Sequence, residues 1–269
     1  MRKFFLIWVT LLLLPTIVYA NIDRGNLSLS AGVGGSVNTS SGKSHFNYDN
    51  LFAAAVDAVN RGTPVPFHAK DKADFVSKLN ADYFQPLPEK ILLGLGFSYF
   101  FESSKDIKSG TYIFANPRNR ADYPKNYVVK TKIDPKGHFS VSVKPGYQVH
   151  KNVLIYSLFS FHHMRANLFS SSSLNTSNLP NIILTNGALR IRDYSERRSF
   201  NGFGLGGGVK YKFFRNWFLD ICAEWVRFGR KKITGPSFTA NRDEVLVDQN
   251  IKIRPTWVDI TSSVGYEFG

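Results

Sequence analysis

The stretch Gly202–Phe228, GFGLGGGVKYKFFRNWFLDICAEWVRF, decides the fold of this chain. Apolar residues take every second position in two runs of about 11–12 residues, which indicates two β-strands and not a helix. Residues 214–216 join the runs in a tight turn. The intervening positions are mostly glycine and lysine in the first run, and Asp220, Cys222 and Glu224 in the second. A broad aromatic face opposite a face of glycine and charge is typical of a strand with lipid outside and a narrow lumen inside.

The start of the chain has the pattern of an export signal. Arg2 and Lys3 precede an apolar run that ends in a small residue, Ala20. We therefore expect a signal peptide over 1–20 and one barrel domain over 21–269. A single helical anchor is the alternative, but the apolar run is short for a membrane span. No later run of 18 or more apolar residues occurs, so a spanning protein would have to be a closed β-barrel. A secreted soluble β protein is the competing hypothesis.

Six further segments alternate between apolar and polar residues, which brings the number of predicted strands to eight. One of them, Val153–His163, is apolar on both faces, so its register stays open. The six segments are Leu27–Val37, Ala73–Phe84, Ile91–Phe101, Phe139–Tyr147, Val153–His163 and Trp257–Phe268.

Short turns and long loops alternate between these strands. The long loops cover about 38–73, 103–137, 165–199 and 229–255, and the first contains a short predicted helix over 51–60. Bacterial outer-membrane barrels have this arrangement, with short periplasmic turns and long external loops. The predicted fold is therefore all-β: an eight-stranded antiparallel transmembrane barrel, an up-and-down meander, with four long external loops.

Three segments carry a family resemblance. They are GFGLGGGVKYKFFRNWFLDICAEW, PGYQVHKNVLIYSLF and the closing SSVGYEF. Together they resemble the small outer-membrane barrels of the OmpA-like and opacity-protein type. The resemblance implies a location in the bacterial outer membrane. The family commonly ends on an aromatic residue that the outer-membrane insertion machinery recognises, which implies that machinery as a partner. Here Phe268 is penultimate and Gly269 follows.

Charged residues on the predicted inner faces carry both signs. An eight-stranded barrel has an interior only wide enough for its own side chains, and unpaired buried charges are costly. We therefore expect these charges to pair across the lumen and fill it; a narrow ion-conducting pore is the alternative. The predicted lumen charge network comprises Lys78, Asp82, Glu102, Lys144, Lys210, Lys212, Asp220, Glu224, Asp259 and Glu267.

The sequence predicts no catalytic, cofactor-binding or metal site. His138 and Ser140 form a His-x-Ser element that resembles part of the site of outer-membrane lipid A deacylases, but parity places both on the inner face, away from lipid. His162 and His163 are adjacent, so on a strand they point to opposite faces and cannot bind one metal together. Cys222 is the single cysteine, which excludes an intrachain disulfide and favours a small lumen filler. A lipid A-modifying enzyme is the least favoured hypothesis.

The predicted external loops carry the positive charge. The formal net charge is +14, and loop 103–137 alone has eight Lys and Arg against three acidic residues. Such a surface attracts polyanions and is screened by salt. The predicted polyanion-binding residues are Lys105, Lys108, Arg118, Arg120, Lys125, Arg190, Arg192, Arg197, Arg198, Arg230, Lys231 and Lys232.

These observations predict an outer-membrane protein with a structural or adhesin-like role. Its expected partners are outer-membrane lipid and lipopolysaccharide, the insertion machinery, and acidic glycans or host surface proteins. Nucleic acid is not an expected partner, because the export signal directs the chain away from it. No cofactor is expected.

Overall fold

The computed structural model describes residues 25–48, 65–68, 73–102, 105–112, 127–174, 190–192, 194–234, 237–240 and 245–268. The predicted signal peptide over 1–20 and the predicted helix over 51–60 lie outside these ranges. Within the described ranges, no helix has the length and hydropathy of a membrane span.

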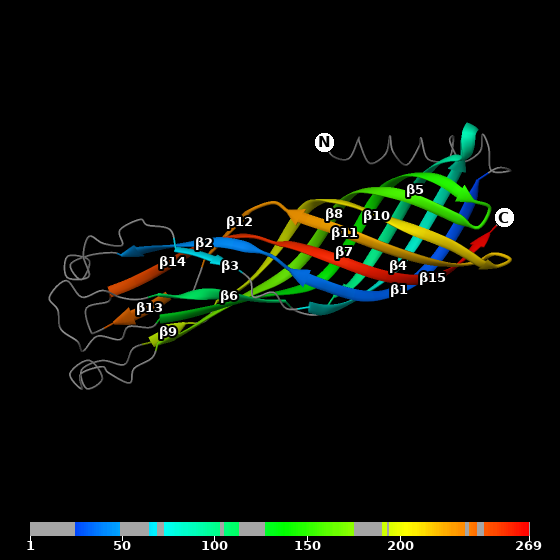
Figure 1. The fold of residues 1–269 in the computed structure, drawn as a ribbon. Helices are drawn as coiled ribbons and strands as arrows, with labels where there is room; N and C mark the ends of the chain where they lie inside the picture. Colours follow the sequence, from blue (N-terminus) through cyan, green and yellow to red (C-terminus); the bar gives the residue numbers. More distant parts are fainter. Residues whose placement is uncertain are drawn as a thin grey trace, which may run out of the picture.

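Eight antiparallel strands form a closed barrel, as the sequence predicts. They follow one another in the order β5-β4-β1-β15-β11-β10-β8-β7, and the pairing of β5 with β7 closes the ring. Figure 1 shows the strands slanting around one long axis. Their bounds are β1 (Asn26–Asn38), β4 (Ala73–Pro86), β5 (Ile91–Glu102), β7 (Tyr127–His150), β8 (Val153–Leu174), β10 (Tyr194–Phe214), β11 (Trp217–Phe228) and β15 (Thr256–Phe268).

The polarity of the barrel wall is the reverse of that of a soluble protein. Along β11, the outward residues Trp217, Ile221 and Trp225 are exposed, whereas Asp220 and Glu224 are buried. The other barrel strands repeat this pattern, with exposed Leu, Val and Phe outside and Ser, Lys and Asp inside. Because a soluble sheet would bury its apolar face, this exterior is a lipid-facing one.

Part-way along the longest strands, the polar residues change to the outward side and the apolar residues to the inward side, as in a soluble protein. On β8, the outward side changes from Phe159 and Phe161 to Arg165, while the buried inner side changes from His162 to Met164. A transmembrane strand needs only about 9–11 residues, and β8 has 22. The change of polarity therefore marks the outer boundary of the membrane, beyond which the sheet continues into solvent.

Three strands accordingly extend further than the sequence predicts. β7 begins at residue 127 and not 139, β8 ends at 174 and not 163, and β10 begins at 194 and not 202. The sequence predicts loops for their outer parts because these parts lack an apolar outward face, and those of β8 and β10 are also rich in Ser and Asn. Hydrogen-bonded ladders between β7 and β8, and between β8 and β10, nevertheless continue through these parts, with one register shift between Pro135 and Gly137.

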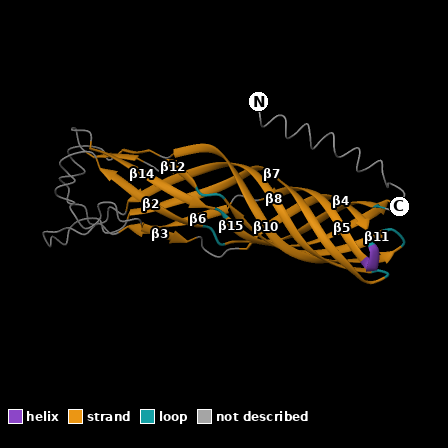
Figure 2. Ribbon diagram, turned by 90° about the horizontal axis from the view of Figure 1, so that it is seen from above, coloured by secondary structure: helices purple, strands orange, loops and turns teal. Residues whose placement is uncertain are grey.

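The remaining predicted loops also contain strands, at the end of the barrel opposite the C-terminus (Figures 1 and 2). A second sheet has the order β3-β2-β14-β13-β9, and β12 pairs with β14. β6 pairs with the outer part of β7. The strands are β2 (Ser41–Tyr48), β3 (Val65–His68), β6 (Lys105–Tyr112), β9 (Arg190–Arg192), β12 (Lys231–Thr234), β13 (Ser237–Ala240) and β14 (Val245–Arg254).

The three short turns lie at the other end of the barrel, as predicted. A short 3₁₀ segment, η2 (Pro88–Lys90), joins β4 to β5, and the turns 150–153 and 214–217 join the next two pairs. Glu89 and Arg215 have positive φ angles of 61° and 40°, which lets the chain reverse in few residues. The C-terminal end of β15 also lies here, and this end corresponds to the periplasmic side.

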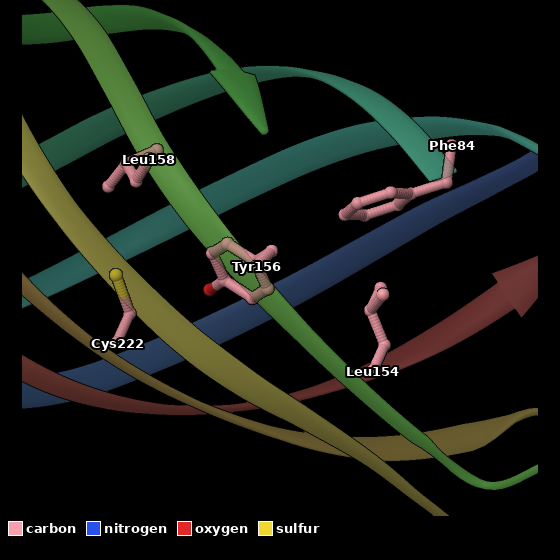
Figure 3. Close-up of a cluster of buried hydrophobic side chains, with 5 residues drawn as sticks. All are labelled: Phe84, Leu154, Tyr156, Leu158 and Cys222. Atoms are coloured by element: carbon pink, nitrogen blue, oxygen red, sulfur yellow. The ribbon is translucent and has the colours of Figure 1, made fainter. Parts of the chain in front are cut away.

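The structure resolves the register of β8 that the sequence left open. Leu154, Tyr156 and Leu158 point inward and form a small buried cluster with Phe84 and Cys222 (Figure 3). The lumen is therefore not wholly polar: apolar side chains fill space between the charged ones. Cys222 is buried in this cluster.

Candidate functional site

The predicted lumen charges lie on the inner faces of six different strands. Asp82 Oδ1 on β4 accepts a hydrogen bond from Lys144 Nζ on β7 at 2.6 Å, and both residues are at most 5% exposed. Lys212 Nζ on β10 lies 2.5 Å from Glu267 Oε2 on β15. Each pair spans one intervening strand: β5 lies between β4 and β7, and β11 lies between β10 and β15.

Two further residues of the predicted lumen charge network have uncharged hydrogen-bond partners. Asp220 accepts hydrogen bonds from the Tyr156 hydroxyl at 2.8 and 3.0 Å. Lys210 Nζ donates to Ser28 Oγ at 3.1 Å and lies within 4.5 Å of the ring centroids of Phe84 and Phe218. Cation–π contact with two rings stabilises a buried ammonium group.

Lys78 and Asp259 complete the middle of the lumen. Asp259 on β15 is directly opposite Glu224 on β11 in the strand register. Lys78 on β4 is buried and interacts electrostatically with Glu224. The structure thus brings the middle members of the predicted set together around Glu224.

Two histidines that the sequence analysis did not combine form the centre of a hydrogen-bonded chain. Glu102 Oε1 lies 2.6 Å from His138 Nδ1. His138 Nε2 lies 2.8 Å from His162 Nδ1, and His162 Nε2 lies 2.8 Å from Glu224 Oε1. Ser160 Oγ lies 2.8 Å from His162 Nε2 and donates to Glu224. We name these five residues the histidine chain.

The register of β7 and β8 explains why the contact was missed. Ser140 is opposite His162, and His138 is opposite Met164, so the two histidines are diagonal neighbours on one face. The sequence analysis compared His162 only with His163, which points outward and bonds Asn201 Oδ1 at 2.7 Å. Parity places His138 on the inner face, but the open register of Val153–His163 leaves the face of His162 undetermined, so the sequence carries no signal for this contact.

The histidine chain is enclosed on all sides that the structure describes. The His138 ring stacks on Phe100 with centroids 4.3 Å apart and meets the rings of Phe228 and Trp257 edge-on. A Cβ atom at Gly204 would overlap Ser160 Oγ and Glu224 Oε1. No group of three or more metal-ligating side chains was found among the described residues. The arrangement can hold and transfer protons.

The predicted polyanion-binding residues lie outside the membrane boundary where the structure describes them. Arg118, Arg120 and Lys125 lie outside the described residues. The backbone places Lys105 and Lys108 on β6, Arg190 and Arg192 on β9, Arg197 and Arg198 on β10, and Arg230, Lys231 and Lys232 at the start of β12. Of these, Arg198 is paired with Glu196.

A denser group of cations joins part of this set to residues that the sequence analysis did not select. Lys232 on β12 is directly opposite Lys252 on β14. Partial burial, followed by the charges of Arg227 and Arg230, lowers the pKa of the Arg254 guanidinium. We name Arg227, Arg230, Lys232, Lys252 and Arg254 the basic cluster. Among the described side chains, no carboxylate forms an ion pair with any of them.

Comparison with known proteins gives no family by sequence. No protein-family model matches the chain, and no curated protein matches it.

Solved structures share the general architecture. The Ail attachment invasion locus protein of Yersinia pestis, solved with the heparin analogue sucrose octasulfate, is 15% identical, with 91% of this chain and 99% of that chain covered and a TM-score of 0.36. The outer membrane protease OmpT from Escherichia coli is 12% identical, with 90% and 97% covered and a TM-score of 0.49. A major outer membrane protein from Thermus thermophilus is 13% identical, with 91% and 99% covered and a TM-score of 0.42.

These likenesses concern the fold alone. The closed barrel, its even number of strands and its apolar exterior around a polar lumen are the architecture of proteins that cross the outer membrane by strands. The chain is therefore a bacterial outer-membrane β-barrel protein of the small-barrel fold.

Proposed function

We propose that this barrel is a surface-interaction protein that binds a polyanionic glycan through the basic cluster, in an adhesin-like and non-catalytic role. One observation carries the proposal: five cations gather on β11, β12, β14 and the segments beside them without a described carboxylate to neutralise them. Like charges held together repel one another. An anion with several charged groups relieves that repulsion at several residues at once.

The fold holds this cluster at the outer face. Arg227 is the next outward residue after Trp225, the last lipid-facing aromatic residue of β11. Lys232 and Lys252 lie further along, on the ladder between β12 and β14. Backbone pairing therefore fixes the spacing of the charges, which reduces the ordering cost of binding a repetitive anion.

Affinity for immobilised heparin tests the proposal. The barrel, refolded into phospholipid nanodiscs, is eluted from the column by increasing salt. The triple variant Arg227→Gln, Arg230→Gln and Arg254→Gln should elute at lower salt than the wild-type protein, because fewer counterions are displaced on binding.

A matched control comes from the periplasmic turns. Lys90, Lys151 and Arg215 are exposed there, and replacing all three by Gln removes the same charge from the opposite end. This variant should elute with the wild-type protein. Equal losses in both triple variants would show that net charge alone governs retention, and the proposal would be wrong.

Lipopolysaccharide phosphates are the competing anion, because the lower part of the cluster lies at the membrane boundary. Nanodiscs that contain lipopolysaccharide separate the two sources. Retention that persists in these discs supports a soluble glycan as the ligand. Retention that disappears shows that the cluster is occupied by membrane phosphates.

A further inference from the structure

The contacts of the histidine chain fix how many protons it holds. Each of its three contacts between Glu102, His138, His162 and Glu224 is 2.6–2.8 Å long, so each contains one proton between two heavy atoms. The contact between His138 Nε2 and His162 Nδ1 cannot hold two protons, because two N–H groups would then face each other. Three protons therefore fill these three contacts, and because the Ser160 hydroxyl is neutral, the chain carries one net negative charge wherever each proton resides.

A fourth proton has no place in these contacts. It either occupies the outer oxygen of a carboxylate or makes both rings imidazolium ions. Only the second outcome places two N–H groups in opposition between the rings. Two imidazolium ions with opposed N–H groups repel each other, and the 2.8 Å contact between His138 and His162 must open.

The charged residues around His138 and His162 can balance a second positive charge. Glu102 on β5 and Glu224 on β11 flank the rings, and Asp259 on β15 is opposite Glu224. Lys78 on β4 opposes them, and Ser160 on β8 and Gly204 on β10 lie beside the chain. The predicted network has four lysines and six acidic residues, so two positive histidines would balance it.

The aromatic layer above the pair depends on the position of the rings. Trp257, Phe200 and Phe228 are among the largest fully buried side chains of the protein. The Phe228 and Trp257 rings are 4.7 Å apart, and both contact His138, as does Phe100. Separation of the histidines therefore displaces the aromatic rings that pack on His138.

A hollow adjoins Glu102, the first residue of the histidine chain. Glu102 lines it together with Tyr99, Phe101 and Lys136, and its volume is about 360 Å³. The hollow lies where the β5–β7 ladder ends, at the pair Phe100 and His138. The Glu102 side chain itself is fully buried.

We propose that the contact between His138 and His162 is a pH-sensitive switch. It holds the aromatic layer in place at neutral pH and releases it when both rings become imidazolium ions. The inference does not depend on the proposed glycan function, because no member of the basic cluster belongs to the histidine chain.

Quenching of Trp257 fluorescence by acrylamide tests the switch. Trp8→Phe, Trp217→Phe and Trp225→Phe leave Trp257 as the only tryptophan of the four in the chain. Quenching of the refolded barrel should rise reversibly as the pH falls from about 8 to about 5, the range in which histidine titrates. In this background His162→Gln should abolish the rise.

His163→Gln is the matched control, since His163 is the next residue on β8 and points outward. It should leave the acid transition unchanged. Quenching that does not depend on pH, or an equal transition in the His162→Gln protein, overturns the proposal. Migration of unboiled protein on a gel verifies that each variant is folded.

A second measurement needs no variant. Nitrogen-15 spectra of the histidine rings count the protonated nitrogens directly. The proposal requires His138 and His162 to gain a proton together with the change in quenching. Rings that keep their neutral-pH protonation through the acid transition contradict it, whatever the behaviour of the His162→Gln protein.

Discussion

Breaking the ion pair between Asp82 and Lys144 should destabilise the barrel more than breaking any described surface pair. Asp82→Asn keeps the shape of the side chain and removes its charge, which leaves Lys144 buried without its carboxylate. Lys144→Met does the reverse. Each single change should lower the free energy of unfolding by about 3–5 kcal/mol, the usual cost of an uncompensated buried charge.

The structure sets this magnitude. At the observed separation of 2.6 Å, Coulomb's law with an effective dielectric constant of about 20 gives roughly 6 kcal/mol of attraction. Desolvation of both ions offsets much of that gain. No water can replace the lost partner easily, since a Cβ atom at Gly96 would already overlap Asp82 Oδ1. The double variant Asp82→Asn, Lys144→Met should therefore cost clearly less than the two single changes together.

Urea titration of the barrel in lipid vesicles, followed by tryptophan fluorescence and by migration of unboiled samples, measures these changes. Asp134→Asn is the control, because Asp134 and Lys136 form a pair of similar length, 2.8 Å, with side chains 23% and 50% exposed. It should cost about 0–1 kcal/mol. Costs of that size for Asp82→Asn as well would refute the reasoning: the lumen would then be hydrated, and the narrow-pore hypothesis would replace the filled barrel.

Three other changes test the wall and the core. Gly204→Ala should destabilise the barrel, since its Cβ would overlap the ends of the Ser160 and Glu224 side chains and force them to shift, whereas Gly35→Ala has nothing within 4 Å and should leave the heat-dependent gel shift unchanged. Ile221→Arg, in the middle of the lipid-facing side of β11, should lower the unfolding free energy in vesicles by about 2–4 kcal/mol; an unchanged urea midpoint would place this face away from lipid. Tyr156→Phe removes the hydrogen bond to Asp220 and should cost about 1–3 kcal/mol in the same titration.

The membrane part of the fold is predictable from sequence because the residues of each strand alternate between two environments, lipid outside and the lumen inside. In β11 the outward residues are apolar from Trp217 to Trp225, and Asp220 and Glu224 lie on the inner face between them. Above the boundary the same period continues with the polarity exchanged: Met164 and Leu168 point inward and Arg165 outward on β8. A search for apolar outward faces misses such a segment, so strands become loops in the prediction although the ladder continues.

The lumen site is less predictable, because parity gives the face of a residue but not its partner. The inward position of Asp82 and of Lys144 follows from alternation, yet their pairing depends on how the strands stagger around the closed ring. The contact of His138 with His162 likewise needs the β7–β8 register, which the turn at 150–153 and the bulges near it determine. A sequence with both faces of β8 apolar does not supply that register.

The level at which the wall changes polarity also explains why the histidine chain is placed where it is. Below it, lysines and carboxylates pair around small apolar fillers; above it, Phe200, Phe228 and Trp257 form a core of soluble type. Side chains at the junction must contact ions on one side and aromatic rings on the other. Histidine meets both demands, since its ring stacks on Phe100 while its nitrogens bond carboxylates. The junction of a polar lumen with an apolar outer core therefore favours titratable rings, and a dependence on pH follows from that position.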